Sequence, residues 1–124
     1  MGIRSLALPS LPVFDPRQIQ SLLDLGAEPG LVQELVGLLE ADVPVRLAAL
    51  DRALSEGDAP RALEEAHHLK GSLGNMGLVQ FADLARQVEE GARGGRLPEA
   101  APPVAAMPTA YREALAALKS AFPA

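Results

Sequence analysis

The chain contains neither cysteine nor tryptophan, and only 3% of its 124 residues are aromatic. The absence of cysteine excludes disulfides, thiolate metal sites and cysteine nucleophiles. Hydrophobic residues nevertheless make up 48% of the chain, so leucine, alanine and valine must provide most of the core. A core of this kind favours packed helices over a sandwich of sheets. The composition therefore predicts an all-α protein.

The chain also lacks an excess of positive charge, with 11 Lys and Arg against 16 Asp and Glu and a formal net charge of −5. This balance argues against non-specific nucleic-acid binding. No apolar run reaches the roughly 18 residues of a membrane span, so no membrane partner is expected. Pro9 and Pro12 break the short apolar stretch at the start, so residues 1–12 are interpreted as a flexible tail, not a signal peptide. We expect a cytoplasmic protein with one domain over residues 13–124.

Capping signals and hydrophobic periodicity predict a short helix followed by a much longer one. Asp15 can cap the first helix, Pro16 suits its first position, and Gln18 stands where a capping box needs it. The second helix is predicted over about residues 29–54, because leucine or valine recurs there every three or four residues. Pro44 lies inside this stripe and should kink or divide the helix.

Three further helices complete the expected fold. Asp58 caps the third, which stops at the Asn-Met-Gly turn of residues 75–77. A fourth helix ends near Gly91, and a stretch with glycines and prolines then leads to a last helix, whose start Pro108 leaves open. No segment has the period of a strand. The pattern predicts an antiparallel four-helix bundle with a short additional N-terminal helix.

Both histidines of the chain stand in the heptad Ala-His-His-Leu-Lys-Gly-Ser at residues 66–72. Positions i, i+3 and i+4 of a helix share one face, so His67, Lys70 and Gly71 would lie together, opposite the core face. A neutral imidazole is available as a nucleophile near pH 7, and Lys70 could neutralise a phosphoryl dianion. The heptad therefore indicates a place to hold a phosphoryl group on His67.

Two glycines on the same face strengthen this interpretation. A glycine inside a helix costs about 1 kcal/mol relative to alanine, and core packing requires neither Gly71 nor Gly74. Both are explained if the backbone of a partner must come close to the imidazole. For Gly74 the alternative is that it only begins the end of the helix.

His68 lies about 100° round the helix from His67, so the two rings do not converge easily on one metal ion. Histidine pairs that bind a metal from one helix are better placed at i and i+4. We therefore predict no metal site, and we place His68 at the margin of the exposed face with no catalytic part.

The stretch Ala-His-His-Leu-Lys-Gly-Ser-Leu-Gly-Asn-Met-Gly closely resembles the signature of histidine-containing phosphotransfer (HPt) domains. Phe-Asp near the start resembles the family's opening, and Leu-Leu-Glu-Ala-Asp-Val-Pro-Val-Arg-Leu-Ala-Ala-Leu resembles its second helix. The resemblance covers Val13 to about Glu90 well. It covers the final helix only loosely, because this chain has prolines where the family usually has an unbroken helix.

The resemblance implies a role for individual residues. His67 matches the phosphorylated histidine, Lys70 matches the lysine that contacts the phosphoryl group, and Gly71 matches the small residue that admits the partner. His68 falls on a variable position. Several family members have Gln or Glu 22 residues after the histidine, bonded to its second ring nitrogen, and Glu89 stands there. Such a carboxylate would fix the tautomer, although an ordinary solvated charge is the alternative.

The leading hypothesis is a phosphorelay intermediate, a phosphocarrier without kinase activity of its own. His67 would accept a phosphoryl group from an aspartyl phosphate on a response-regulator receiver domain and pass it to another receiver. A hybrid sensor kinase is a further expected partner. Mg²⁺ and the acidic pocket would belong to the receiver, so no cofactor is expected. Leu63 and Glu64 share the motif face and are candidates for partner docking, and we expect a monomer.

Two alternatives remain open. A dimerisation segment of a sensor kinase would have an acidic residue directly after the histidine, whereas His68 follows His67 here, and no Gly-rich ATP-binding segment is visible. A non-catalytic helical module that only binds or sequesters receivers is the second alternative. The presence of His67, Lys70 and Gly71 together counts against it.

Overall fold

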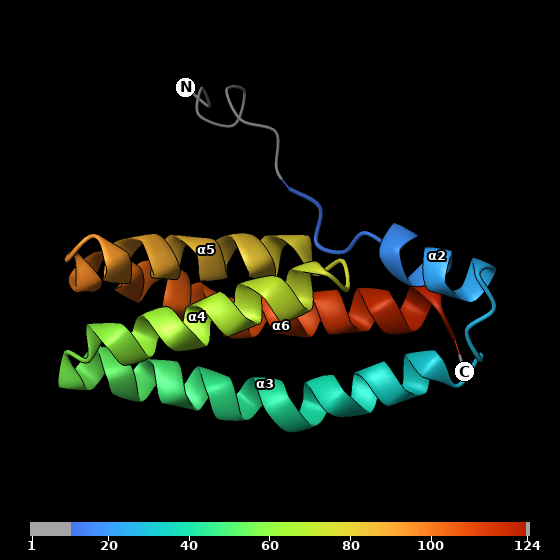
Figure 1. The fold of residues 1–124 in the computed structure, drawn as a ribbon, viewed down its shortest axis with the longest axis horizontal. Helices are drawn as coiled ribbons and strands as arrows, with labels where there is room; N and C mark the ends of the chain where they lie inside the picture. The colour runs from blue at the N-terminus through green and yellow to red at the C-terminus, as the bar shows by residue number, and fades with distance from the viewer. Residues whose placement is uncertain (1–10, 124) are drawn as a thin grey trace.

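The structure is a computed structural model that describes residues 11–123, so most of the predicted tail lies outside the described residues. The described chain is helical and contains no strand (Figure 1). Its elements, in order, are α2 (Arg17–Asp24), α3 (Leu31–Glu56), α4 (Ala59–Gly74), α5 (Val79–Arg93), the 3₁₀ turn η1 (Leu97–Ala100) and α6 (Ala101–Ala121).

Four long helices run side by side, and consecutive ones reverse direction (Figure 1). Helix α4 packs against both α3 and α5, and α6 closes the bundle against α5 and α3. The short α2 lies at the end of the bundle where α3 begins and α6 ends (Figure 1). The predicted all-α fold, a four-helix bundle with a short extra helix at its start, is confirmed.

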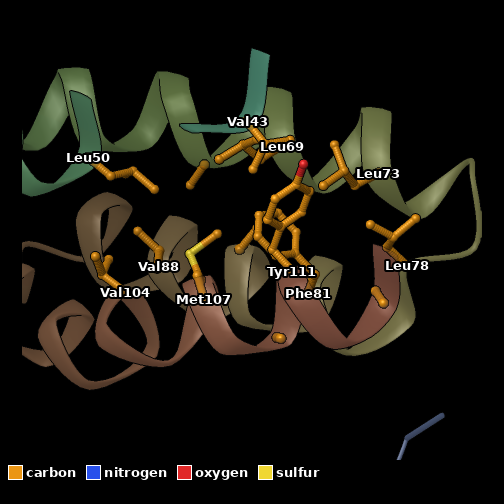
Figure 2. Close-up of a cluster of buried hydrophobic side chains, with 14 of the residues drawn as sticks. Val43, Leu50, Leu69, Leu73, Leu78, Phe81, Val88, Val104, Met107 and Tyr111 are labelled. Atoms are coloured by element: carbon orange, nitrogen blue, oxygen red, sulfur yellow. The ribbon is translucent and has the colours of Figure 1, made fainter. Parts of the chain in front are cut away.

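The core is aliphatic, as the composition predicts. Figure 2 shows side chains from all four long helices meeting in it, with Phe81 and Tyr111 edge to face at a centroid distance of 6.2 Å. The largest fully buried hydrophobic side chains of the core are Phe81, Ile19, Leu50, Leu69, Leu73, Leu78, Met107 and Leu118. The Tyr111 hydroxyl is buried and has no hydrogen-bond partner among residues 11–123. This core fixes which face of α4 is turned outward.

Pro44, which was predicted to kink or divide the long helix, does not divide it. Helix α3 is continuous from Leu31 to Glu56, with Pro44 exposed in its interior. Leu39 and Val43 on one side of the proline and Leu50 on the other are buried in the same core. We attribute the continuity to this packing, which holds both halves in line despite the lost hydrogen bond.

The capping box predicted at the start of α2 is not formed. The Asp15 carboxylate does accept the amide of Arg17 at 3.0 Å, but no side-chain hydrogen bond from Gln18 returns to Asp15. The reason is tertiary, because the Asp15 amide donates to the Gly77 carbonyl at 2.8 Å. Gly77 has a φ of +93°, and a Cβ there would lie 2.1 Å from the Asp15 carbonyl oxygen. Only glycine fits this close approach.

The last two helices leave a shorter connection than the sequence suggested. Helix α5 continues past Gly91 to Arg93, and α6 begins at Ala101, directly after η1. Pro102 and Pro103 lie in the first turn of α6, where a proline loses no intrahelical hydrogen bond. Pro108 lies inside the helix without ending it. Pro102 and Pro103 are therefore compatible with a helix that begins at Ala101, and Pro108 does not interrupt it.

Candidate functional site

Helix α4 presents His67 and Gly71 to solvent because its two faces differ so strongly. The Asp58 carboxylate caps the helix by accepting the Arg61 amide at 3.1 Å, as predicted. The core face is completely or almost completely buried and consists of Ala62, Ala66, Leu69 and Leu73. On the opposite side, 70% of the His67 side chain is exposed. The imidazole thus stands on a rigid helix and faces outward.

His67 is held by a carboxylate from the next helix. Its Nδ1 lies 2.7 Å from Oε2 of Glu89, 22 residues further along the chain on α5. Only 2% of the Glu89 side chain is exposed, so this residue is not the solvated charge that was the alternative. An ionised carboxylate can only accept, so in the neutral ring Nδ1 carries the proton and Nε2 has the free lone pair.

Glu89 is ionised because three donors surround it. Burial alone would raise its pKa, but hydrogen bonds from Lys70, His67 and Arg93 outweigh burial and hold the pKa of Glu89 at about 2, against an ordinary 4.5. The Lys70 Nζ donates to Oε1 at 2.6 Å, and the Arg93 Nη2 donates to Oε2 at 2.9 Å. The carboxylate therefore stays negative, and so able to fix the His67 tautomer, throughout the neutral pH range.

Arg93 is the member of this cluster that sequence reasoning missed. It follows Glu89 by four residues on α5, and that spacing places opposite charges side by side on a helix. The signal was present in the sequence. It became visible as part of the site only once Glu89 was known to be buried under His67.

The two glycines occupy different environments. A Cβ on Gly71 would meet nothing within 4 Å, so the structure offers no packing reason for a glycine there. A Cβ on Gly74 would lie 3.4 Å from the Cβ of Ala82 on α5. Gly74 thus lies at the contact between two helices, where a small residue also suits the packing. Its part in partner access stays a prediction.

Leu63 and Glu64 lie one turn before His67, as the periodicity placed them. They line a shallow depression of about 320 Å³ whose other walls are Pro60, His67, Glu89 and Arg93. Glu64 is exposed, and Leu63 is half-buried against the core. The depression gives the imidazole a partly apolar border on this side.

His68 faces the other neighbour, α3. Its Nε2 lies 3.6 Å from the Asp42 carboxylate, and Asp42 also binds Arg46. The same Arg46 also binds a buried glutamate that sequence reasoning did not anticipate, Glu65, at a distance of 2.9 Å. Glu65 in turn binds Arg61 at 3.2 Å. Among residues 11–123, no group of three or more His, Cys, Asp and Glu side chains is arranged to hold a metal ion.

The family model for the Hpt domain matches residues 34–121, well over half of the chain. The chain belongs to the Hpt domain family. This Hpt domain is also similar in structure to histidine-containing phosphotransfer protein B (HptB) from Pseudomonas aeruginosa PAO1, whose crystal structure it matches with a TM-score of 0.76 and 31% sequence identity. The match covers 91% of this chain and 96% of that one. A search of curated protein sequences finds no match.

Membership of the Hpt domain family establishes the class of function. The chain is a phosphotransfer intermediate of two-component signalling, in which Hpt domains act as phosphocarriers and interact with response-regulator receivers and kinases. None of the helices in the described part of this Hpt domain is both long and apolar enough to span a membrane.

Proposed function

We propose that His67 accepts a phosphoryl group from the aspartyl phosphate of one receiver domain and passes it to the aspartate of another. One observation carries the proposal. Nδ1 of His67 is engaged by the buried, ionised Glu89, so the unprotonated Nε2 belongs to a ring that is 70% exposed. A nucleophile on a rigid helix, with its tautomer fixed and its reactive atom outward, suits transfer between two proteins.

The transfer step balances without any further reactant. The Nε2 lone pair forms a bond to phosphorus while the phosphorus–oxygen bond of the aspartyl phosphate breaks, and the donor carboxylate leaves with the electron pair. The proton on Nδ1 stays hydrogen bonded to Glu89, whose negative charge balances the positive charge that the ring gains. The second transfer is the reverse of this step. We assign Mg²⁺ and the acidic pocket to the receiver, so that this chain needs no cofactor.

Lys70 supports the phosphoryl group in this proposal. In the unphosphorylated chain its ammonium donates to Oε1 of Glu89 and is 38% exposed. An ammonium has three donors, and Glu89 takes one of them. The remaining two are available to the oxygens of a phosphoryl group on His67. A charged donor that is already fixed near the histidine needs little reorganisation when the phosphoryl group arrives.

The partners are response-regulator receivers and a hybrid sensor kinase. Gly71 supports this assignment, because its exposed position beside His67 leaves open space where a side chain would stand. We place the docking surface around Gly71, with Leu63 and Glu64 at its border and Gly74 at its far end. We further propose that the chain works as a cytoplasmic monomer, with one domain over residues 13–124 and a flexible tail before it.

The test is a transfer assay with a ³²P-labelled receiver. Label should appear on the wild-type chain, in an acid-labile and alkali-stable form, and should move on to a second receiver. His67→Gln should take up no label, whereas His68→Gln should take up label normally. Label on His67→Gln at the wild-type level would refute the proposal. Label from ATP alone would indicate a sensor-kinase segment, and receiver binding without transfer would indicate a sequestering module.

A further inference from the structure

Arg93 contacts the carboxylate that holds His67, but it has no part in the transfer step described above. Its Nη2 lies 2.9 Å from Oε2 of Glu89, the same oxygen that accepts the His67 Nδ1 proton at 2.7 Å. Lys70 occupies the other oxygen, Oε1, at 2.6 Å. Each oxygen of Glu89 therefore has a cation of its own, and the imidazole shares an oxygen with Arg93.

Lys70 and Arg93 would have different roles once His67 is phosphorylated. In the proposed function the two remaining donors of Lys70 bind the phosphoryl oxygens, so its positive charge is shared between the phosphoryl group and Oε1 of Glu89. Within the described residues, Arg93 is then the cationic side chain that binds this carboxylate without also serving the phosphoryl group. A carboxylate that is 98% buried gains protons more readily when less positive charge is bound to it, and a protonated Glu89 would lose the negative charge that balances the positive charge on the phosphorylated ring.

We propose that Arg93 is a positioning residue of the phosphotransfer site, which keeps Glu89 ionised and directed at His67 while Lys70 serves the phosphoryl group. The inference rests on the proposed roles of His67 and Lys70. Arg93 acts through its charge as well as through its geometry. Because Arg93 offsets the negative charge of Glu89, it weakens the attraction of the carboxylate for a second proton on the ring.

The charged groups around the His67 ring come from both helices that meet there. Glu64 and Lys70 are on α4, and Glu89 and Arg93 are on α5. Arg93 can be replaced while the ring, its carboxylate partner and the lysine stay unchanged. Its side chain is 60% exposed, so its removal should leave the fold intact.

The first experiment follows the His67 ring by NMR as the pH is changed, in the unphosphorylated full chain. A His68→Gln background leaves His67 as the single histidine. Arg93→Gln should move the midpoint of the titration upward by about 0.5 pH unit, a value reduced for solvent screening. Arg93→Lys should restore most of the wild-type midpoint. Arg86→Gln is the matched control, because it removes the same charge from α5 but from a pair with Asp83 and Glu90.

The second experiment measures the rate of transfer from a phosphorylated receiver against pH. In Arg93→Gln the rate should fall to half of its plateau at a pH about 0.5 unit higher than in the wild type, as the ring titration requires. Equal midpoints in Arg93→Gln and Arg86→Gln would overturn the inference, and so would a midpoint that Arg93→Lys fails to restore. If no chain is labelled at all, the proposed function fails, while the ring titration still decides the role of Arg93.

Discussion

Two buried glutamates, Glu65 on α4 and Glu89 on α5, each bind two cationic side chains. Glu65 binds Arg46 and Arg61 and so connects α4 to α3. Glu89 binds Lys70 and Arg93 and connects α5 to α4. The side chains of both are at least nine-tenths buried. By charge and burial alone the two clusters are alike.

They differ in one partner. Glu89 also accepts from an imidazole whose other nitrogen is free for chemistry, whereas Glu65 has only arginines around it. His68, which lies near the Glu65 cluster, pairs with Asp42 at 3.6 Å and leaves Glu65 untouched. A buried ion cluster is by itself weak evidence of either stability or function. What marks the Glu89 cluster as the candidate site is the exposed imidazole that it orients.

The largest expected effect concerns stability at low pH. The folded pKa of Glu89 is depressed from 4.5 to about 2, so its ionised form stabilises the fold above pH 4.5, and this contribution is lost as the pH falls toward 2. It amounts to at most about 3 kcal/mol. Replacing Glu89 by Gln should therefore lower the free energy of unfolding near neutral pH, and the difference from the wild type should shrink between pH 4.5 and 2. Urea unfolding at a series of pH values measures this.

Two features sharpen that measurement. Asp15 also has a pKa lowered to about 2, through its hydrogen bonds with Arg17, so the wild type alone would report both groups. The difference between wild type and Glu89→Gln isolates Glu89. The exposed neighbour Glu90, replaced by Gln, is the control for the loss of a carboxylate from α5. If the difference in free energy of unfolding between wild type and Glu89→Gln were constant with pH, the pKa of the Glu89 carboxyl would not be lowered in the folded chain.

The second effect separates the two clusters by their chemistry. Glu89→Ala removes the acceptor of the Nδ1 proton and should slow transfer from a phosphorylated receiver by about 10- to 100-fold, the range found when a histidine loses its hydrogen-bonded partner in metal sites. Glu89→Gln should recover most of the rate, because its carbonyl oxygen can still accept. Glu65→Ala should change the rate by less than about threefold, since it touches no reacting group.

These rates require folded chains, which circular dichroism at the assay temperature establishes for each variant. An equal loss of transfer in Glu65→Ala and Glu89→Ala would break the comparison, because both clusters would then act only through the fold. Failure of Glu89→Gln to recover would mean that the charge of Glu89 matters more than the hydrogen bond.

The Glu89 cluster was more accessible from the sequence than the Glu65 cluster. His67, Lys70 and Gly71 follow from helix spacing, and Glu89 was placed by the family resemblance at a fixed distance along the chain. Glu65 and Arg46 are 19 residues apart on different helices. Their pairing depends on the axial register of α3 against α4, and hydrophobic periodicity does not determine this register.

Local signals failed where a distant contact competed with them. The sequence around Gln18 predicts a capping box, but Gly77 takes the Asp15 amide that the box needs. Pro44 predicts a break, but buried residues on both sides keep α3 continuous. Asp58, whose capping involves only its own helix, was predicted correctly. The fold class depends on many such local signals together, so single failures did not change it.

The smallest effect tests whether a partner covers the Glu89 side of α4. Gly71→Ala fills open space on a helix, so it should stabilise the fold by about 0.5 kcal/mol. It should also slow transfer several-fold, because the new methyl group would stand in the docking surface proposed for the receiver. Gly37 offers a matched control, since it is a helical glycine on α3 with equally open space. Gly37→Ala should also stabilise the fold but leave the transfer rate unchanged. Thermal melts and the receiver assay measure the two quantities, and equal rates in both variants would place the docking surface away from Gly71.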